Sequence, residues 1–76
     1  MDATVQPTSR KRPLSDVHVP RLREHRLRRA LSQHELAELS KVSRTTIIKI
    51  EAGRDAWPQT VRKLARALRV KPADLM

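Results

Sequence analysis

Few side chains in this sequence have the types and spacing that enzyme chemistry needs. The three histidines, His18, His25 and His34, lie seven and nine residues apart, whereas two zinc ligands on one helical face lie four residues apart. The chain has no cysteine and one glycine, which leaves no cysteine-ligated zinc and no glycine-rich phosphate loop. Its serines and aspartates suggest no nucleophile elbow. We therefore expect no catalytic residue, no metal, no cofactor and no small-molecule ligand.

The basic side chains are the more informative set. Seventeen Lys and Arg against eight Asp and Glu give the 76 residues a net charge of +9. This charge favours a polyanionic partner, nucleic acid first and an anionic membrane surface second. Residues 20–29 have five basic and one acidic side chain, residues 52–76 have six and two, and residues 30–51 have three of each. Basic flanks around a neutral centre suit a protein that holds phosphates with its flanks and reads bases with its centre.

The length of the chain limits the architecture. A domain of this size buries only about 60% of its unfolded surface, which is too little for a deep catalytic cavity. The absence of cysteine suits a reducing cytoplasm. No apolar run approaches the roughly 20 residues that span a bilayer, so we expect a cytoplasmic, nucleoid-associated protein without a membrane partner.

The neutral centre predicts two short helices joined by a turn. Ser32 and Glu35 form a capping box, which starts a helix by satisfying its free amides. Residues 40–42 interrupt the pattern after about two turns, and Ser43 can cap a second helix. Such a pair is the unit that places a recognition helix in a DNA groove. The inward residues of the second helix are Ile47 and Ile50.

Two alternatives apply to this stretch. Residues 45–48 are β-branched throughout, and propensity alone predicts a strand. Ile47, Ile50 and Glu51 nevertheless follow helical spacing, and nothing nearby offers a partner strand. An ordinary helical hairpin without a role in DNA binding also fits the local residues.

A preceding helix is predicted over residues 20–31, with Pro20 at its first position. Arg26 falls inside the apolar arc of this helix, where a charge must reach solvent or meet a buried partner. Glu51 flanks the inward isoleucines of the second central helix and is the natural partner. The remaining arginines of residues 20–29 point away, as a solvated face. The apolar arc consists of Leu22, Leu27 and Ala30.

Beyond the centre, Gly53 supplies a left-handed turn and Pro58 opens another helix. The apolar stripe of that helix is Val61, Leu64, Ala65 and Leu68. We expect Trp57 to anchor the core or its rim. A last short helix begins at Pro72 and is too short to bury every apolar residue near it. Val70, Leu75 and Met76 are therefore candidates for a dimer contact, with closure over the core as the alternative.

Residues 1–19 contain no helical periodicity and are predicted to be a disordered basic leader, followed by a helix-turn-helix domain over residues 20–76. Pro7 and Pro13 break any helix there. As an alternative, Arg10, Lys11 and Arg12 form an arm that follows DNA into the minor groove.

Taken together, the sequence resembles the phage repressor and Cro family of helix-turn-helix proteins, often labelled XRE. The resemblance covers residues 20–76. It implies an all-α fold, a compact bundle of five short helices of the lambda-repressor-like DNA-binding type, with residues 33–39 and 44–51 as the second and third. The matching residues include Leu22, Arg26, Ser32, Gln33, Leu36, Ala37, Val42, Ser43, Ile47, Ile50, Glu51, Gly53, Val61, Leu64, Ala65 and Leu68.

The resemblance also implies roles for individual residues. Gln33 corresponds to the glutamine that grips phosphate in this family, and Arg44 and Thr45 to the residues that meet base edges. The family's buried pair between the first and third helices matches Arg26 and Glu51. The complete set of DNA-binding candidates is Gln33, Ser43, Arg44, Thr45, Thr46, Lys49 and Arg54.

Chemistry and position distinguish three of these candidates. Arg44 best suits a guanine, because its guanidinium matches the O6/N7 edge. Lys49 lies on the same exposed side as Thr45 and should reach a phosphate or a base. Arg54 is expected to contact phosphate from the loop.

The sequence departs from the family at several positions. Ala30, Lys41 and Arg69 stand where the family usually has glycine, and each would cost roughly 1 kcal/mol relative to glycine if its φ is positive. Ile48 occupies an outward, usually polar position, where it is either an ordinary exposed residue or a contact for a thymine methyl group.

These observations predict a sequence-specific, DNA-binding transcriptional regulator, a repressor of prokaryotic or phage type. Its recognition helix spans about residues 43–51, and its partner is double-stranded DNA with a two-fold operator bound by a homodimer. The alternatives are an antitoxin-like protein that binds a protein partner, a restriction-modification controller and a membrane-surface peptide.

Overall fold

The computed structural model describes residues 17–76. This part of the chain contains five helices, which are α2 (Leu22–Arg28), α3 (Gln33–Ser40), α4 (Arg44–Glu51), α5 (Pro58–Leu68) and α6 (Pro72–Leu75). The predicted all-α bundle of five short helices is confirmed. The bounds of the two central helices lie within one residue of those predicted, and the strand alternative for residues 45–48 is wrong.

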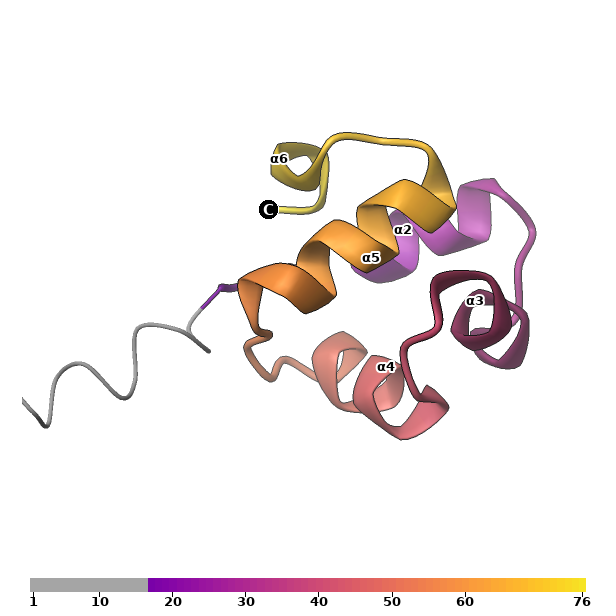
Figure 1. The fold of residues 1–76 in the computed structure, drawn as a ribbon, viewed down its shortest axis with the longest axis horizontal. Helices are drawn as coiled ribbons and strands as arrows, with labels where there is room; N and C mark the ends of the chain where they lie inside the picture. The colour runs from indigo at the N-terminus through magenta and orange to yellow at the C-terminus, as the bar shows by residue number, and fades with distance from the viewer. Residues whose placement is uncertain (1–16) are drawn as a thin grey trace, which may run out of the picture.

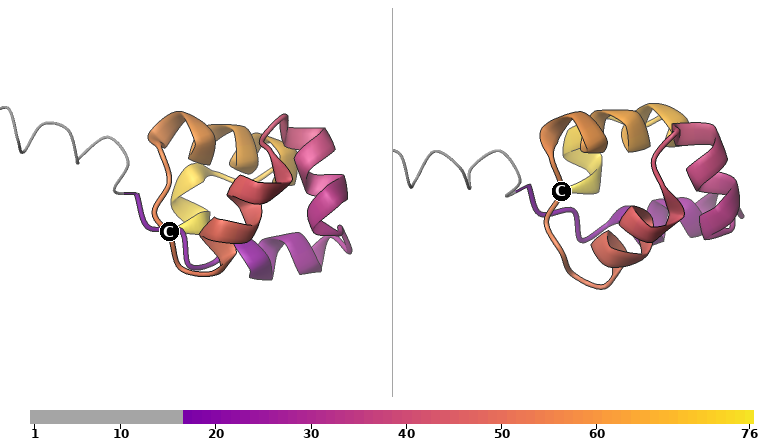
Figure 2. Two further views of the ribbon diagram at one scale, coloured as in Figure 1. Left: turned by 90° about the horizontal axis from the view of Figure 1, so that it is seen from below. Right: turned by 60° about the horizontal axis from the view of Figure 1, so that its bottom comes forward.

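Helix α5 crosses the middle of the molecule, with α6 on one side and α3 and α4 on the other (Figure 1). It packs against both α3 and α6, while α4 packs against α3 and α2. Figure 2 shows α3 and α4 meeting at an angle around their short turn. The core between these helices consists of Val19, Leu22, Leu36, Val42, Ile47, Ile50, Ala56, Val61, Leu64, Ala65, Leu68 and Leu75.

The folded unit begins earlier than predicted. Val17 and Ala56 form an antiparallel bridge through two backbone hydrogen bonds of 3.1 and 2.8 Å. Val19 is almost completely buried. Residues 17–19 therefore belong to the domain rather than to the leader, because they close the core beside the loop after α4. Residues 1–16, including the predicted basic arm, lie outside the described residues.

Helix α2 differs from its predicted form at both ends. It begins at Leu22 rather than Pro20 and ends at Arg28. Leu27 and Ala30 are exposed, so the predicted apolar arc is wrong beyond Leu22. Ala30 lies beyond the end of α2. Leu27 lies within the helix, but it is five positions after Leu22 and therefore about 140° around the axis, away from the buried side of Leu22 and Arg26.

The two central helices begin at the predicted caps. Ser32 Oγ accepts a hydrogen bond from the Glu35 amide at 3.0 Å, and Glu35 Oε1 accepts one from the Ser32 amide at 2.8 Å. Ser43 Oγ accepts from the Thr46 amide at 3.1 Å. Between the helices, buried Ser40 donates to the Leu36 carbonyl and accepts from the Val42 amide. The Ser40 hydroxyl thus provides hydrogen-bond partners for backbone groups on both sides of the turn, which connects the end of α3 to the segment that leads into α4.

The carboxyl-terminal apolar residues have different environments. Leu75 is fully buried under α5, which corrects its assignment as a dimer contact. Val70 is half-buried, and Met76 stays 52% exposed. Helix α6 has few residues, but its single inward position suffices to bury Leu75 in the monomer.

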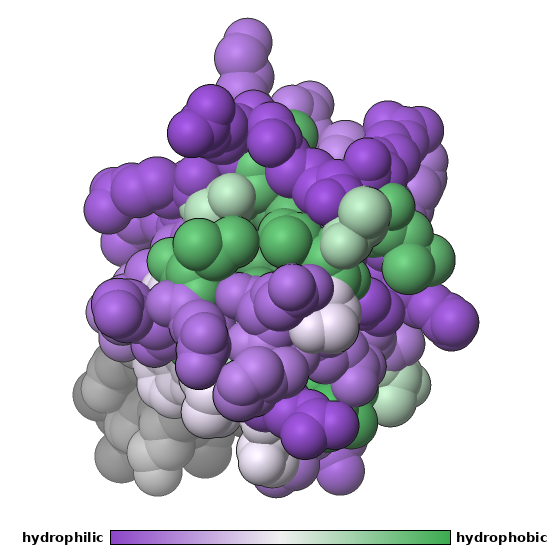
Figure 3. Space-filling view, turned by 90° about the vertical axis from the view of Figure 1, so that its right-hand side faces the viewer, coloured by the Kyte–Doolittle hydropathy of each residue, from purple (hydrophilic) through white to green (hydrophobic). Residues whose placement is uncertain are grey.

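Some apolar surface remains outside the core. Figure 3, which views the side of the molecule occupied by α3, shows a green area enclosed by hydrophilic side chains. Trp57, at the start of α5, is half-exposed, as a residue on the rim of the core would be. The large apolar side chains that remain exposed in residues 17–76 are Leu27, Leu39, Ile48, Trp57 and Met76.

Within residues 17–76, three residues other than glycine have a left-handed backbone, with φ values of 57° at Ala30, 65° at Lys41 and 59° at Arg69. These are the positions where the family usually has glycine, so the turns keep the family geometry without it. Lys41 and Arg69 directly follow α3 and α5. A cation at a helix C-terminus gains about 0.3–1 kcal/mol, which offsets part of the strain. Ala30 has no such compensation.

We therefore predict that Ala30→Gly raises the free energy of unfolding by about 0.5–1 kcal/mol, because glycine adopts positive φ without strain. Ala52 is the matched control, since it is also exposed but has φ of −85°. Ala52→Gly should lower the free energy of unfolding by a similar amount. Urea denaturation measures both, and two changes of the same sign would contradict the prediction.

Candidate nucleic-acid interface

The outer face of α4 presents four exposed side chains in two parallel rows. Arg44 and Ile48 form one row, and Thr45 and Lys49 form the other. Residues four apart on a helix are neighbours along its surface, so each row is one turn long. The opposite face of α4 carries two buried isoleucines of the core. This burial holds α4 by one side and leaves the other side free to enter a groove.

Ser43 and Thr46 have a local task at the start of α4. Besides accepting the Thr46 amide, Ser43 donates its hydroxyl to Thr46 Oγ1 at 2.8 Å. Both were predicted as DNA-binding residues. Their polar groups stabilise the first turn of the helix, on which Arg44 and Thr45 stand.

Arg26 of α2 and Glu51 of α4 make the ion pair expected from the sequence. Arg26 Nε donates to Glu51 Oε2 at 2.7 Å and Nη2 donates to Oε1 at 3.0 Å, a bidentate pairing. The two side chains are only 9% and 6% exposed. Arg26 Nη1 also donates to the Leu31 carbonyl at 2.8 Å, which ties down the loop between α2 and α3.

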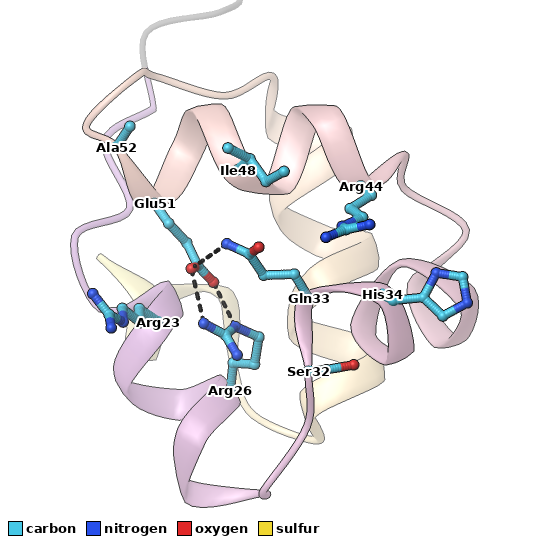
Figure 4. Close-up of a pocket in the computed structure, with 9 residues that line it drawn as sticks. All are labelled: Arg23, Arg26, Ser32, Gln33, His34, Arg44, Ile48, Glu51 and Ala52. Atoms are coloured by element: carbon cyan, nitrogen blue, oxygen red, sulfur yellow. Dashed lines mark hydrogen bonds and ion pairs between the residues drawn. The ribbon is translucent and has the colours of Figure 1, made fainter.

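Gln33 joins the same network from the first position of α3. Its Nε2 donates to Glu51 Oε1 at 3.0 Å, so a single carboxylate receives side chains from two other helices (Figure 4). The sequence predicted a phosphate contact for Gln33 and gave no indication of this bond. The side-chain amide has a second hydrogen, which leaves one donor for a ligand.

The network controls the ionisation of Glu51. Burial by itself would raise the pKa of the Glu51 carboxyl, but hydrogen bonds from Arg26 and Gln33 and the charges of Arg26 and Arg23 lower it below its usual value. The pKa of Arg26 is raised by its hydrogen bond to Glu51, against the effect of burial. Because the carboxyl pKa is lowered on folding, the pair stabilises the fold above the ordinary pKa. That contribution to stability is lost as the pH falls through the lowered pKa that the Glu51 carboxyl has in the folded protein.

An open hollow lies over this network, between α2, α3 and α4 (Figure 4). Arg23 and Arg44 stand at its rim, and both are exposed. The sequence had placed Arg23 on a solvated face, although its position three residues before Arg26 brings it to the same side of α2. The hollow is lined by Arg23, Arg26, Ser32, Gln33, His34, Arg44, Ile48, Glu51 and Ala52.

A second hollow adjoins the other row of α4 and contains two predicted DNA contacts, Lys49 and Arg54. The Arg54 amide donates to the Lys49 carbonyl at 3.0 Å, which holds the loop against the end of α4. Exposed Trp57 lines the same hollow. Basic side chains thus flank the exposed face of α4 on both sides.

Other candidate chemistry gains little support within residues 17–76. No group of histidine, aspartate and glutamate residues in this range could hold a metal ion. His18 and His34 are exposed and lie near Asp55 and Glu38, at 3.6 and 3.2 Å. No helix in the described part of the chain is long and apolar enough to cross a membrane.

Comparisons with known proteins agree with this geometry. A helix-turn-helix family model matches residues 22–75. The chain is also similar to the crystal structure of the restriction-modification controller protein C.AhdI from Aeromonas hydrophila. The TM-score is 0.70 and the sequence identity 40%, covering 74% of this chain and 86% of that one. The comparison with curated proteins finds no match.

The fold and the exposed face of α4 define a helix-turn-helix DNA-binding protein. The chain belongs to the helix-turn-helix family of phage repressor and Cro type, and it is a DNA-binding transcriptional regulator. The resemblance seen in the sequence is confirmed.

We predict that Arg26→Ala lowers the free energy of unfolding by about 3–5 kcal/mol, because it leaves the Glu51 carboxylate buried without its partner. Arg23→Ala is the matched control, since it removes an exposed arginine from the same helix. Urea denaturation at neutral pH compares them. Equal losses for the two variants would show that the ion pair does not act as a buried pair.

Proposed function

We propose that this protein binds a specific DNA operator by inserting the amino end of α4 into the major groove. The observation that carries this proposal is the exposed face of α4, which is rich in donors and is held rigidly from behind by the core and by the Glu51 network. In this family of folds the first residues of the second helix of the motif contact base edges. Arg44 and Thr45 occupy those positions.

The proposed DNA-binding side chains divide into those that contact bases and those that contact phosphates. Arg44 is proposed to read a guanine through two hydrogen bonds, with Thr45 and Lys49 beside it. Gln33 and Arg54 hold the phosphates on either side. Arg23 adds a further phosphate contact, because it stands on the rim of the hollow opposite Arg44. A contact to phosphate positions the protein without reading sequence.

The biological form is proposed to be a homodimer on a two-fold operator, which represses transcription by occupying promoter DNA. Val70 and Met76 remain candidates for the dimer contact because both retain exposed surface. The proposal includes no catalytic step. In a prokaryotic cell such a regulator works on the nucleoid, in the cytoplasm.

A restriction-modification controller is a second candidate, favoured by the similarity to the restriction-modification controller protein C.AhdI. It uses the same DNA-binding mechanism and differs in the genes that it regulates. An antitoxin-like protein that binds a protein partner is a further alternative. It would depend on a protein-binding surface rather than on the reading face of α4.

The test compares a proposed base contact, Arg44, with a proposed phosphate contact, Arg54, on a preferred site selected from random DNA. Arg44→Ala should cost roughly 1–3 kcal/mol on that site and relax the choice of base at one position per half-site. Arg54→Ala should weaken all sequences about equally and reduce the slope of log affinity against log salt by about one unit. The binding curves also report whether one or two chains occupy the duplex.

Arg44→Lys is the matched control, because it keeps the charge and loses the planar pair of donors. It should relax base choice at the same position as Arg44→Ala while retaining the salt dependence. If Arg44→Ala instead lowers the affinity for every single-base variant by one factor, Arg44 is a phosphate contact. Binding to duplex DNA that does not depend on salt would contradict the proposed function itself.

A further inference from the structure

Ile48 is the one apolar side chain in the two rows of the reading face. It is 43% exposed, and its row also contains Arg44, one turn earlier. The side chain projects from α4 over the first hollow, between Arg44 and Glu51 (Figure 4). The core does not need it, since Ile47 and Ile50 already fill the inward positions of α4.

The major groove offers one apolar group to such a side chain. Each thymine presents its C5-methyl group there, beside the hydrogen-bonding edges of the bases. Contact between this methyl and an exposed isoleucine removes apolar surface of both from water. Ile48 also suits the task because a β-branched side chain in a helix has one strongly preferred χ1 rotamer, so little freedom is lost on binding.

The distance along α4 indicates which base is concerned. One helical turn separates Ile48 from Arg44 and advances about 5.4 Å along the axis. Successive bases of one strand are about 3.4 Å apart along the duplex. A base met by Ile48 therefore lies within one or two steps of the base that Arg44 reads.

Resting on the proposed function, we propose that Ile48 is a specificity-determining residue that reads the 5-methyl group of a thymine one or two base pairs from the guanine bound by Arg44. The Arg26–Glu51–Gln33 network forms the floor of the hollow beside Ile48, and basic side chains that would draw in the neighbouring phosphates stand at its rim.

Deoxyuridine provides the test, because it differs from thymidine only by the missing methyl group. Each thymine of the selected site is replaced singly by deoxyuridine, and dissociation constants are measured at one salt concentration. The wild type should lose about fourfold in affinity at one thymine per half-site, the effect of one buried methyl. The variant Ile48→Ala should bind the thymine site more weakly and show no further loss with deoxyuridine at that position.

The exposed residue Leu39 on α3 provides the control, since Leu39→Ala removes apolar surface away from the reading face. That variant should keep the full deoxyuridine penalty. The inference would be overturned if no deoxyuridine lowered the affinity of the wild type, or if the selected half-site contained no thymine at this distance from the guanine. It would also be overturned if Ile48→Ala kept the full loss of affinity. These results would leave the proposed function standing, whereas a protein that prefers no DNA sequence would contradict the function instead.

Discussion

The arrangement of this small domain depends on the Glu51 carboxylate. It receives Arg26 from α2 and Gln33 from α3, and it belongs to α4, so three helices meet at two oxygen atoms. A buried ion pair adds little net stability relative to apolar side chains of similar size, because removing both charges from water is costly. Its geometry, however, tolerates little displacement. We interpret the network as the element that sets the direction of the reading helix rather than as the main source of stability.

Three turns of the domain have a backbone conformation that is strained for the residues they contain. Ala30, Lys41 and Arg69 adopt a left-handed backbone that glycine would adopt without strain. Strain of this kind persists where the surrounding structure determines the backbone. Here Arg26 Nη1 donates to the Leu31 carbonyl in the loop after α2. Arg29 Nε donates to the Leu68 carbonyl at the end of α5, at 2.9 Å. These contacts restrain the loop that contains Ala30 and the end of α5, and Lys41 and Arg69 each place a cation at a helix C-terminus.

The sequence predicted the local features of this fold well. The caps at Ser32 and Ser43 are encoded within four residues, and Ile47 and Ile50 follow from helical period alone. The Arg26–Glu51 pair was accessible as well, because a charge inside an apolar arc requires a partner.

Features that depend on packing between distant segments were not accessible. Val19 is buried in the core two residues after the Val17–Ala56 bridge, and Leu75 is buried where α6 packs against α5. Neither neighbour can be seen from the flanking residues. The bond from Gln33 to Glu51 could not be predicted, because Gln33 is only partly buried and its amide, unlike the charge of Arg26, does not require a protein partner. The prediction that Leu27 is buried was wrong, because Leu27 lies on a different side of α2 from the buried residues Leu22 and Arg26.

The most direct test of this account replaces the ion pair by apolar residues in the double variant Arg26→Met, Glu51→Leu. Apolar substitution of a buried pair is often neutral or stabilising, so the variant should unfold in urea at a concentration close to that of the wild type. Gln33 would then lack its acceptor, and α4 would keep its apolar packing against α2 and α3 but lose its hydrogen bonds to them. We predict that the preference for the selected operator over a scrambled duplex falls about tenfold, comparable to one mismatched base pair. A double variant that folds and discriminates as well as the wild type would contradict the claim that this network positions the reading helix.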